Sequence, residues 1–206
     1  MKINKKRYVM CCVFFFKTFF AVAPLSLSET DLVDIAEINA RILLDMRYAT
    51  VDNFTKQKIY DSPKCYFRRA VALKLDAIQQ ELEKIGLGLK IWDGYRPLSA
   101  QRKLWAVLPD RRFVMPPEIG SRHNRGASVD LTIVDKHGNE IVMPTGFDEF
   151  SPKVHPDYMQ LPKKVIKNRQ LLKNIMAKHD FLPIKTEWWH FDHKDWATYD
   201  LLDISI

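Results

Sequence analysis

Two short stretches that carry histidine and carboxylate side chains, far apart along the chain, constrain what this sequence can fold into. The first contains His123 and Asp130, and the second contains Glu187 and His190. Two imidazoles and one carboxylate form a three-ligand catalytic zinc set with an open fourth position, and the spare carboxylate can act as a base beside it. The sequence therefore predicts a fold that brings both stretches to one site binding a single Zn²⁺ ion.

The spacing within each stretch makes demands on the backbone. Gly126 gives the chain freedom to turn from a loop into a strand between the first two candidate ligands. Glu187 and His190 are three residues apart, and such positions face opposite sides of an ideal strand. Either a bulge near Trp188 or an approach from the sheet edge is needed. Spacing alone leaves the ligand assignment open, and we expect surface or core roles for His137, His155, His179 and His193.

Hydrophobic periodicity predicts an α+β domain with a small central antiparallel sheet flanked by helices. A chain of 206 residues with 47% hydrophobic content suits a single domain, which we place at residues 24–206. We expect helices over a short segment capped by Ser28 and over 65–85, 99–108 and 162–179, and strands over 42–44, 89–92, 127–134, 140–143 and 184–192.

The first 23 residues are typical of a signal peptide. A basic start precedes an apolar run from Val9 to Ala23, which ends in a small-x-small pattern. Lys17 interrupts this run, and the run is shorter than the ~20 residues of a membrane span. We expect cleavage after residue 23 or within 25–28, and a periplasmic or secreted location rather than a cytoplasmic one. An uncleaved anchor or a misassigned start codon are the alternatives.

The net positive charge of the chain comes mainly from this leader. Five of the basic residues and none of the acidic ones fall in residues 1–23, so the net charge of +7 largely disappears from the mature part. We therefore expect no nucleic-acid partner and no stable membrane association once the leader is removed. Cys65 is the only cysteine beyond the leader, which excludes an internal disulfide and leaves a packed or surface thiol. The oligomeric state is not determined by the sequence.

The order of the motifs resembles a known family. Ser-x-His-x-x-Gly-x-x-x-Asp at 121–130, followed by Glu-x-Trp-His at 187–190, is the signature of the zinc D,D-peptidases. The chain is most similar to the D-alanyl-D-alanine dipeptidases, of the vancomycin-resistance dipeptidase type. Segments 47–54, 92–97 and 146–150 also look like that family, so the resemblance covers residues 30 to 195.

The resemblance implies a role for each motif residue. By it, His123, Asp130 and His190 are the zinc ligands and Glu187 is the catalytic base. Arg96 matches the arginine that stabilises the tetrahedral oxyanion, a sensible use of a fixed guanidinium. A salt bridge between Arg96 and a nearby aspartate, Asp93, is the structural alternative.

Three further residues match the positions that hold the substrate. Asp148 and Tyr48 match the residues that bind the free ammonium, although Asp148 could instead be a turn residue. Ser121 matches a serine near the substrate carboxylate. The chain departs from the family pattern at Arg122, where a small residue is common. This cation could help hold the substrate carboxylate or point to solvent.

The resemblance implies hydrolysis of D-alanyl-D-alanine to two D-alanine molecules in a small closed pocket. The bound metal would make a water acidic enough to attack the peptide carbonyl, with Glu187 as general base and acid. A zinc D,D-carboxypeptidase acting on peptidoglycan stem peptides is the alternative with the same chemistry and an open cleft. A zinc-bearing binding protein without catalysis is a third, but such relatives usually lose part of the catalytic set that this chain keeps.

Overall fold

A five-stranded sheet forms the centre of the domain. In spatial order its strands are β2 (Leu43–Leu44), β4 (Leu87–Asp93), β5 (Ser128–Asp135), β7 (His190–His193) and β6 (Phe181–Pro183). Every residue of β5 except the last is buried, and β4 is nearly as enclosed. Chain on both sides of the sheet must therefore cover these central strands. The structure is a computed structural model and describes residues 27–206.

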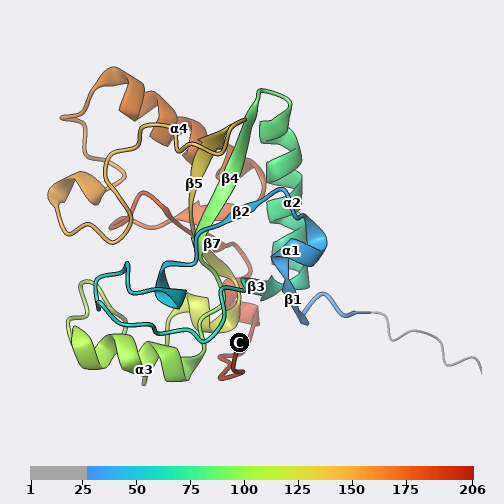
Figure 1. Cartoon of the computed structure of the whole chain (residues 1–206), viewed down its shortest axis with the longest axis vertical. Coiled ribbons are helices and arrows are strands. Elements are labelled where there is room, and N and C mark those ends of the chain that lie inside the picture. Colours follow the sequence, from blue (N-terminus) through green and yellow to red (C-terminus); the bar gives the residue numbers. More distant parts are fainter. Residues whose placement is uncertain (1–26) are drawn as a thin grey trace, which may run out of the picture.

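Helices lie around this sheet, with α2 along one side and α4 on the other (Figure 1). The helix α2 packs against β4, and its buried stripe repeats at helical spacing, with Val71, Leu75, Ile78 and Leu82 fully buried. A separate antiparallel pair joins β1 (Leu32–Asp34) to β3 (Tyr66–Arg68). The helices are α1 (Ile35–Ile38), α2 (Arg69–Glu83), α3 (Leu98–Val107) and α4 (Lys163–Lys178).

The predicted α+β class and the helical segments at 99–108 and 162–179 are confirmed. The sheet is antiparallel at every pairing except the β2–β4 edge, where the strands run parallel. The long helix begins only at Arg69, because the preceding residues pair with β1 instead of coiling. The predicted strand at 140–143 is wrong, since that segment makes only a bridge between Val134 and Glu140.

The predicted strand at 184–192 is also wrong over most of its length. β6 ends just before this range, β7 begins within it at His190, and residues 184–189 are irregular. Two backbone bonds hold the irregular part: Trp188 donates to the carbonyl of Val154 at 2.9 Å, and Leu131 donates to that of Trp189 at 3.1 Å. The Ser28 segment is a turn followed by a strand, and α1 is capped instead by Asp34.

The structure describes Cys65 but not the leader. The predicted signal peptide at 1–23 lies outside the described residues, so its prediction stays untested. Within residues 27–206, no helix combines the length and apolar character needed to cross a membrane. Cys65 is a fully buried, free thiol, which decides for a packed residue over a surface one.

Candidate metal centre

Strand pairing brings two of the candidate ligands together. Asp130 on β5 and His190 on β7 are register partners in neighbouring antiparallel strands, so their side chains leave the same face of the sheet. His123 comes from η2 (Arg122–Arg125), a short 3-10 helix that leads into β5 and ends at Gly126, with a φ of 69°. A left-handed residue at that position favours glycine, which explains the turn toward β5.

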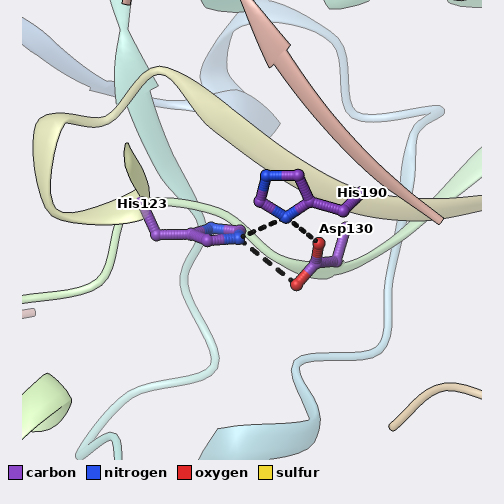
Figure 2. A group of neighbouring side chains, drawn as sticks. All are labelled: His123, Asp130 and His190. Carbon is purple, nitrogen blue, oxygen red and sulfur yellow. Dashed lines mark hydrogen bonds and ion pairs between the residues drawn. The ribbon is translucent and has the colours of Figure 1, made fainter. Parts of the chain in front are cut away.

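The three side chains converge within a small buried volume (Figure 2). His190 Nδ1 lies 2.9 Å from one oxygen of Asp130, and His123 Nε2 lies 3.4 Å from the other. The two imidazole nitrogens are 3.2 Å apart. One ligand atom from each residue falls within 4.8 Å of the others, so the structure groups all three predicted ligands.

The outer nitrogen of each imidazole has its own partner. His123 Nδ1 donates to the carbonyl of Gly94 at 2.8 Å, and His190 Nε2 donates to the carboxylate of Asp192 at 2.9 Å. When both imidazoles are neutral, their inner nitrogens turn lone pairs toward the Asp130 carboxylate. Three electron-rich atoms in one buried place require a cation, and nitrogen and carboxylate donors of this kind suit zinc.

The protonation behaviour of the cluster agrees with that requirement. Burial opposes protonation of His190, yet the carboxylates of Asp130 and Asp192 raise its pKa well above the ordinary value. Burial likewise favours a neutral Asp130, but the two imidazoles hold its pKa below the usual range. The site thus stabilises positive charge between the imidazoles and the carboxylate.

Asp192 contacts the candidate ligand His190, and the sequence reasoning missed it. It is almost fully buried and accepts a hydrogen bond from Ser128 Oγ at 2.6 Å, besides the bond from His190. Burial opposes its ionisation, but the bond from His190 and the charge of Arg122 contribute to a pKa of about 2. Its position two residues after His190 in a strand, hence on the same face, was the available signal.

Arg122 makes contacts that were not considered from the sequence. Its guanidinium forms an ion pair with Asp192 and lies over the ring of Trp196, with 4.4 Å from the guanidinium carbon to the ring centroid. The side chain is 43% exposed and also lines the cavity above the metal ligands. The departure from the family pattern therefore adds a cation to the carboxylate that orients His190.

Glu187 lies in the irregular segment before β7, so the three-residue spacing imposes no strand geometry on it. One of its carboxylate oxygens is 3.9 Å from His190 Nδ1, the inner nitrogen. Burial raises the pKa of Glu187 above its ordinary value, although His190 opposes this. A carboxylate of raised pKa beside the metal ligands is suited to accept and return a proton.

Arg96 makes the salt bridge considered as an alternative and also lines the cavity. Its Nη2 and Nε donate to the same oxygen of Asp93 at 2.5 and 3.2 Å, and its Nη1 donates to Gln101 at 2.9 Å. A guanidinium has five N–H donors, and these bonds use three of them. The guanidinium carbon also lies 5.2 Å from the ring centroid of Tyr48. The pair with Asp93 fixes the guanidinium at the wall of the cavity.

Tyr48 and Asp148 meet across the same cavity. The Tyr48 hydroxyl donates to a carboxylate oxygen of Asp148 at 2.8 Å. Asp148 has a left-handed backbone, with a φ of 54°, so it is also a turn residue. Burial raises the pKa of Asp148 well above its ordinary value, and the Tyr48 hydrogen bond opposes that shift. A bound ammonium would remove the cost of ionising this carboxylate.

Ser121 caps the helix that carries the first ligand. Its hydroxyl accepts a hydrogen bond from the backbone of His123 at 3.3 Å, and Asn124 Oδ1 accepts from the Ser121 backbone at 2.6 Å. The serine also lines the cavity. The remaining histidines stand outside the ligand cluster, although His155 lies at the cavity wall.

A cavity of about 920 Å³ is lined by the three candidate ligands and by Tyr48, Arg96, Ser121, Asp148 and Glu187. It is larger than the small closed pocket expected from the sequence. Trp189 contributes to its wall, whereas Trp92 and Trp188 are buried in the core. A buried three-donor metal site, an adjacent carboxylate and an open cavity define the class of mononuclear metal-dependent hydrolases.

Comparison with known proteins identifies the family. The model of the D-ala-D-ala dipeptidase family, Peptidase_M15, matches residues 28–203, and the chain belongs to that family. A D-alanyl-D-alanine dipeptidase of Escherichia coli is 38% identical over 84% of this chain and 90% of its own length. One from Streptomyces coelicolor is 32% identical over 80% of this chain and 92% of its own length. The resemblance found in the motifs is confirmed.

Solved structures show a weaker likeness to this chain. A mutant of the vancomycin-resistance D,D-pentapeptidase VanY in complex with Zn(II) is 13% identical, with a TM-score of 0.43 over 63% of this chain and 74% of its own. The D,D-dipeptidase VanXYg, in complex with a D-Ala-D-Ala phosphinate analogue, is 19% identical, with a TM-score of 0.38 over 80% of this chain and 66% of its own.

Proposed function

We propose that this chain hydrolyses D-alanyl-D-alanine to two D-alanine molecules with one Zn²⁺ ion. The convergence of His123, Asp130 and His190 beside Glu187 carries this proposal, because it joins a cation-requiring donor set to a base. Curated relatives that match most of this chain are named D-alanyl-D-alanine dipeptidases.

The residues around the donor set divide the catalytic work. Zinc held by the two histidines and Asp130 would supply a Lewis acid that polarises the peptide carbonyl and acidifies water. Glu187 takes the proton of the attacking water and returns it to the leaving amine, which its raised pKa favours. Arg96, fixed by Asp93, directs its remaining N–H donors toward the oxygen that gains negative charge.

The two ends of the dipeptide have separate partners in the cavity. Asp148, held by the Tyr48 hydroxyl, binds the free ammonium. Ser121 can donate its hydroxyl proton to the terminal carboxylate while its oxygen keeps the bond from His123. An N-blocked substrate would leave the Asp148 carboxylate without a cation, which is costly in a partly buried place.

The decisive experiment measures D-alanine release from D-Ala-D-Ala by the zinc-loaded protein, with N-acetyl-D-Ala-D-Ala and a Glu187→Gln variant alongside. We expect turnover of the free dipeptide only, and a loss of about 10²–10⁴ in kcat for the variant at unchanged zinc content. An active variant would remove Glu187 from the chemistry. No turnover at full zinc occupancy would instead indicate a zinc-binding protein without catalysis.

The size of the cavity favours one rival, a D,D-carboxypeptidase that acts on peptidoglycan stem peptides. A longer substrate would fit in a cavity of about 920 Å³, but it would bring no ammonium to Asp148. The N-acetylated substrate decides between the two functions. Equal turnover of blocked and free dipeptides would establish the carboxypeptidase and deprive Asp148 of its assigned role.

We also infer that the chain is exported to the periplasm or secreted and loses its first 23 to 28 residues. The basic and apolar pattern of the leader supports this inference. The near balance of charge beyond the leader supports a small dipeptide as the partner, without nucleic acid or stable membrane attachment. Intact-mass measurement of protein from the periplasmic fraction tests it, and an uncut chain in the cytoplasm would contradict it.

A further inference from the structure

Large apolar side chains line a part of the cavity that contains none of the proposed catalytic or substrate-binding residues. Phe113, Met115, Ile119 and Phe150 line this cavity, and each is between 42% and 52% exposed. Single exposed apolar residues are normal on a protein surface, whereas several in one concavity indicate a binding surface. This part of the cavity is therefore a candidate binding surface for an apolar group of a ligand.

Three aromatic rings from three separate loops form the core of this surface, which we call the aromatic trio: Phe54, Phe113 and Phe150. The rings of Phe113 and Phe150 are 4.8 Å apart between centroids, and those of Phe54 and Phe150 are 6.0 Å apart, both edge to face. Arg112 lies over the Phe113 ring at 5.3 Å and is itself paired with Asp110. These contacts give the trio a defined shape.

The trio adjoins the pair that binds the ammonium. Phe54 packs edge to face on Tyr48 at 6.2 Å between centroids, and the Tyr48 hydroxyl holds Asp148. Phe150 follows Asp148 by two residues, and both line the cavity. A dipeptide whose ammonium meets Asp148 and whose peptide bond meets the metal ligands therefore has its first side chain nearest to the trio.

The volume of the cavity leaves room for such a side chain. At about 920 Å³ it lies near the upper end of the ~300–1,000 Å³ typical of pockets for drug-sized ligands. Two alanines are far smaller than such a ligand. The apolar wall would thus stay in contact with water when D-Ala-D-Ala binds, and a larger first residue would cover it.

We propose that the aromatic trio of Phe54, Phe113 and Phe150 is a subsite for a large apolar side chain on the N-terminal residue of the substrate. The substrate class then includes D,D-dipeptides such as D-Phe-D-Ala and D-Leu-D-Ala, besides D-Ala-D-Ala. This inference rests on the proposed function, because Asp148 must bind the ammonium for the first side chain to reach the trio.

Steady-state kinetics with D-Phe-D-Ala, D-Ala-D-Phe and D-Ala-D-Ala test the subsite in the wild-type protein and in the Phe113→Ala and Phe150→Ala variants. Val142→Ala is the control, because Val142 is 54% exposed and does not line the cavity. We expect the ratio of kcat/KM for D-Phe-D-Ala to that for D-Ala-D-Ala to fall about tenfold in both phenylalanine variants. It should not change in the control.

An unchanged ratio in both variants would overturn the subsite. An equal loss of kcat/KM for all three substrates would also overturn it, because the rings would then only close the cavity. A selective loss of kcat/KM for D-Ala-D-Phe would overturn it too, because the C-terminal side chain would then occupy the trio. Titration calorimetry on the zinc-loaded Glu187→Gln protein separates this failure from failure of the proposed function. Tighter binding of D-Phe-D-Ala than of D-Ala-D-Ala, lost in Phe150→Ala, supports the subsite even without turnover, and equal binding refutes it.

Discussion

Replacing Asp192 by asparagine should weaken zinc binding without removing a ligand. The carboxylate accepts from His190 Nε2 at 2.9 Å and from Ser128 at 2.6 Å through one oxygen, and pairs with Arg122 through the other. Every neighbour is a donor, so the amide group of asparagine must turn its own N–H donors toward one of them. The loss of charge also makes His190 a less basic ligand.

The expected size of the effect follows from this loss of an outer-shell partner. Such changes cost about 10–100-fold in metal affinity, or about 1.4–2.7 kcal/mol at roughly 1.4 kcal/mol per tenfold. The asparagine can keep its oxygen toward His190 if Arg122, which is 43% exposed, swings into solvent. This rearrangement favours a loss of zinc affinity in the lower half of that range.

Competition with a chelator of known affinity measures the zinc dissociation constant of the purified protein. Asp195→Asn is the matched control, because Asp195 is an exposed aspartate three residues further along whose hydrogen bonds are made by its backbone atoms. Denaturant unfolding of the metal-free proteins checks that both variants fold. A dissociation constant for Asp192→Asn within about threefold of wild type would refute the assignment of Asp192 as the residue that orients His190.

Two further predictions concern the ammonium site and the core. Burial raises the pKa of Asp148 well above its ordinary value, so this carboxylate is protonated at a higher pH than an exposed aspartate. Because the protonated group cannot pair with the ammonium, the KM for D-Ala-D-Ala should rise as the pH falls through that raised pKa. Asp148→Asn should raise KM about 10–150-fold at neutral pH and abolish this pH dependence; the same dependence in both proteins would contradict the role of Asp148. A methyl group on Gly94 would lie 2.7 Å from Cys65 Sγ and from the Phe67 ring, whereas at Gly146 it would meet nothing within 4 Å. Gly94→Ala should therefore lower the free energy of unfolding by about 1–3 kcal/mol, and Gly146→Ala should leave it nearly unchanged. Equal unfolding midpoints in denaturant would show that the backbone at Gly94 relaxes freely.

The strand prediction at 184–192 shows where sequence periodicity misleads. The segment is rich in aromatic residues, which favour strands, but Trp188 and Trp189 make their backbone bonds to Val154 and Leu131 in an irregular path. Those partners are remote in sequence, so no local pattern could reveal them. The irregular path also removes the difficulty of the three-residue spacing between Glu187 and His190, which assumed an ideal strand.

Arg96 illustrates a choice that residue identity left open. The sequence left open whether Arg96 stabilises the oxyanion or forms a salt bridge with Asp93. The structure contains the bridge, which holds the guanidinium at the cavity wall with donors still unused. Only the position of the turn that carries Arg96, relative to the sheet and to Gln101, produces this outcome.

The sequence by itself determined the chemical types of the donor set, the α+β class and the helices with a regular apolar stripe, because these depend on residue identity and on spacing over a few positions. Tertiary structure alone decided that Asp130 faces His190, that Asp192 orients the imidazole, and that the cavity exceeds the size of the dipeptide. These features depend on strand register and on contacts between distant segments, and the free energy of such contacts belongs to no single stretch of chain.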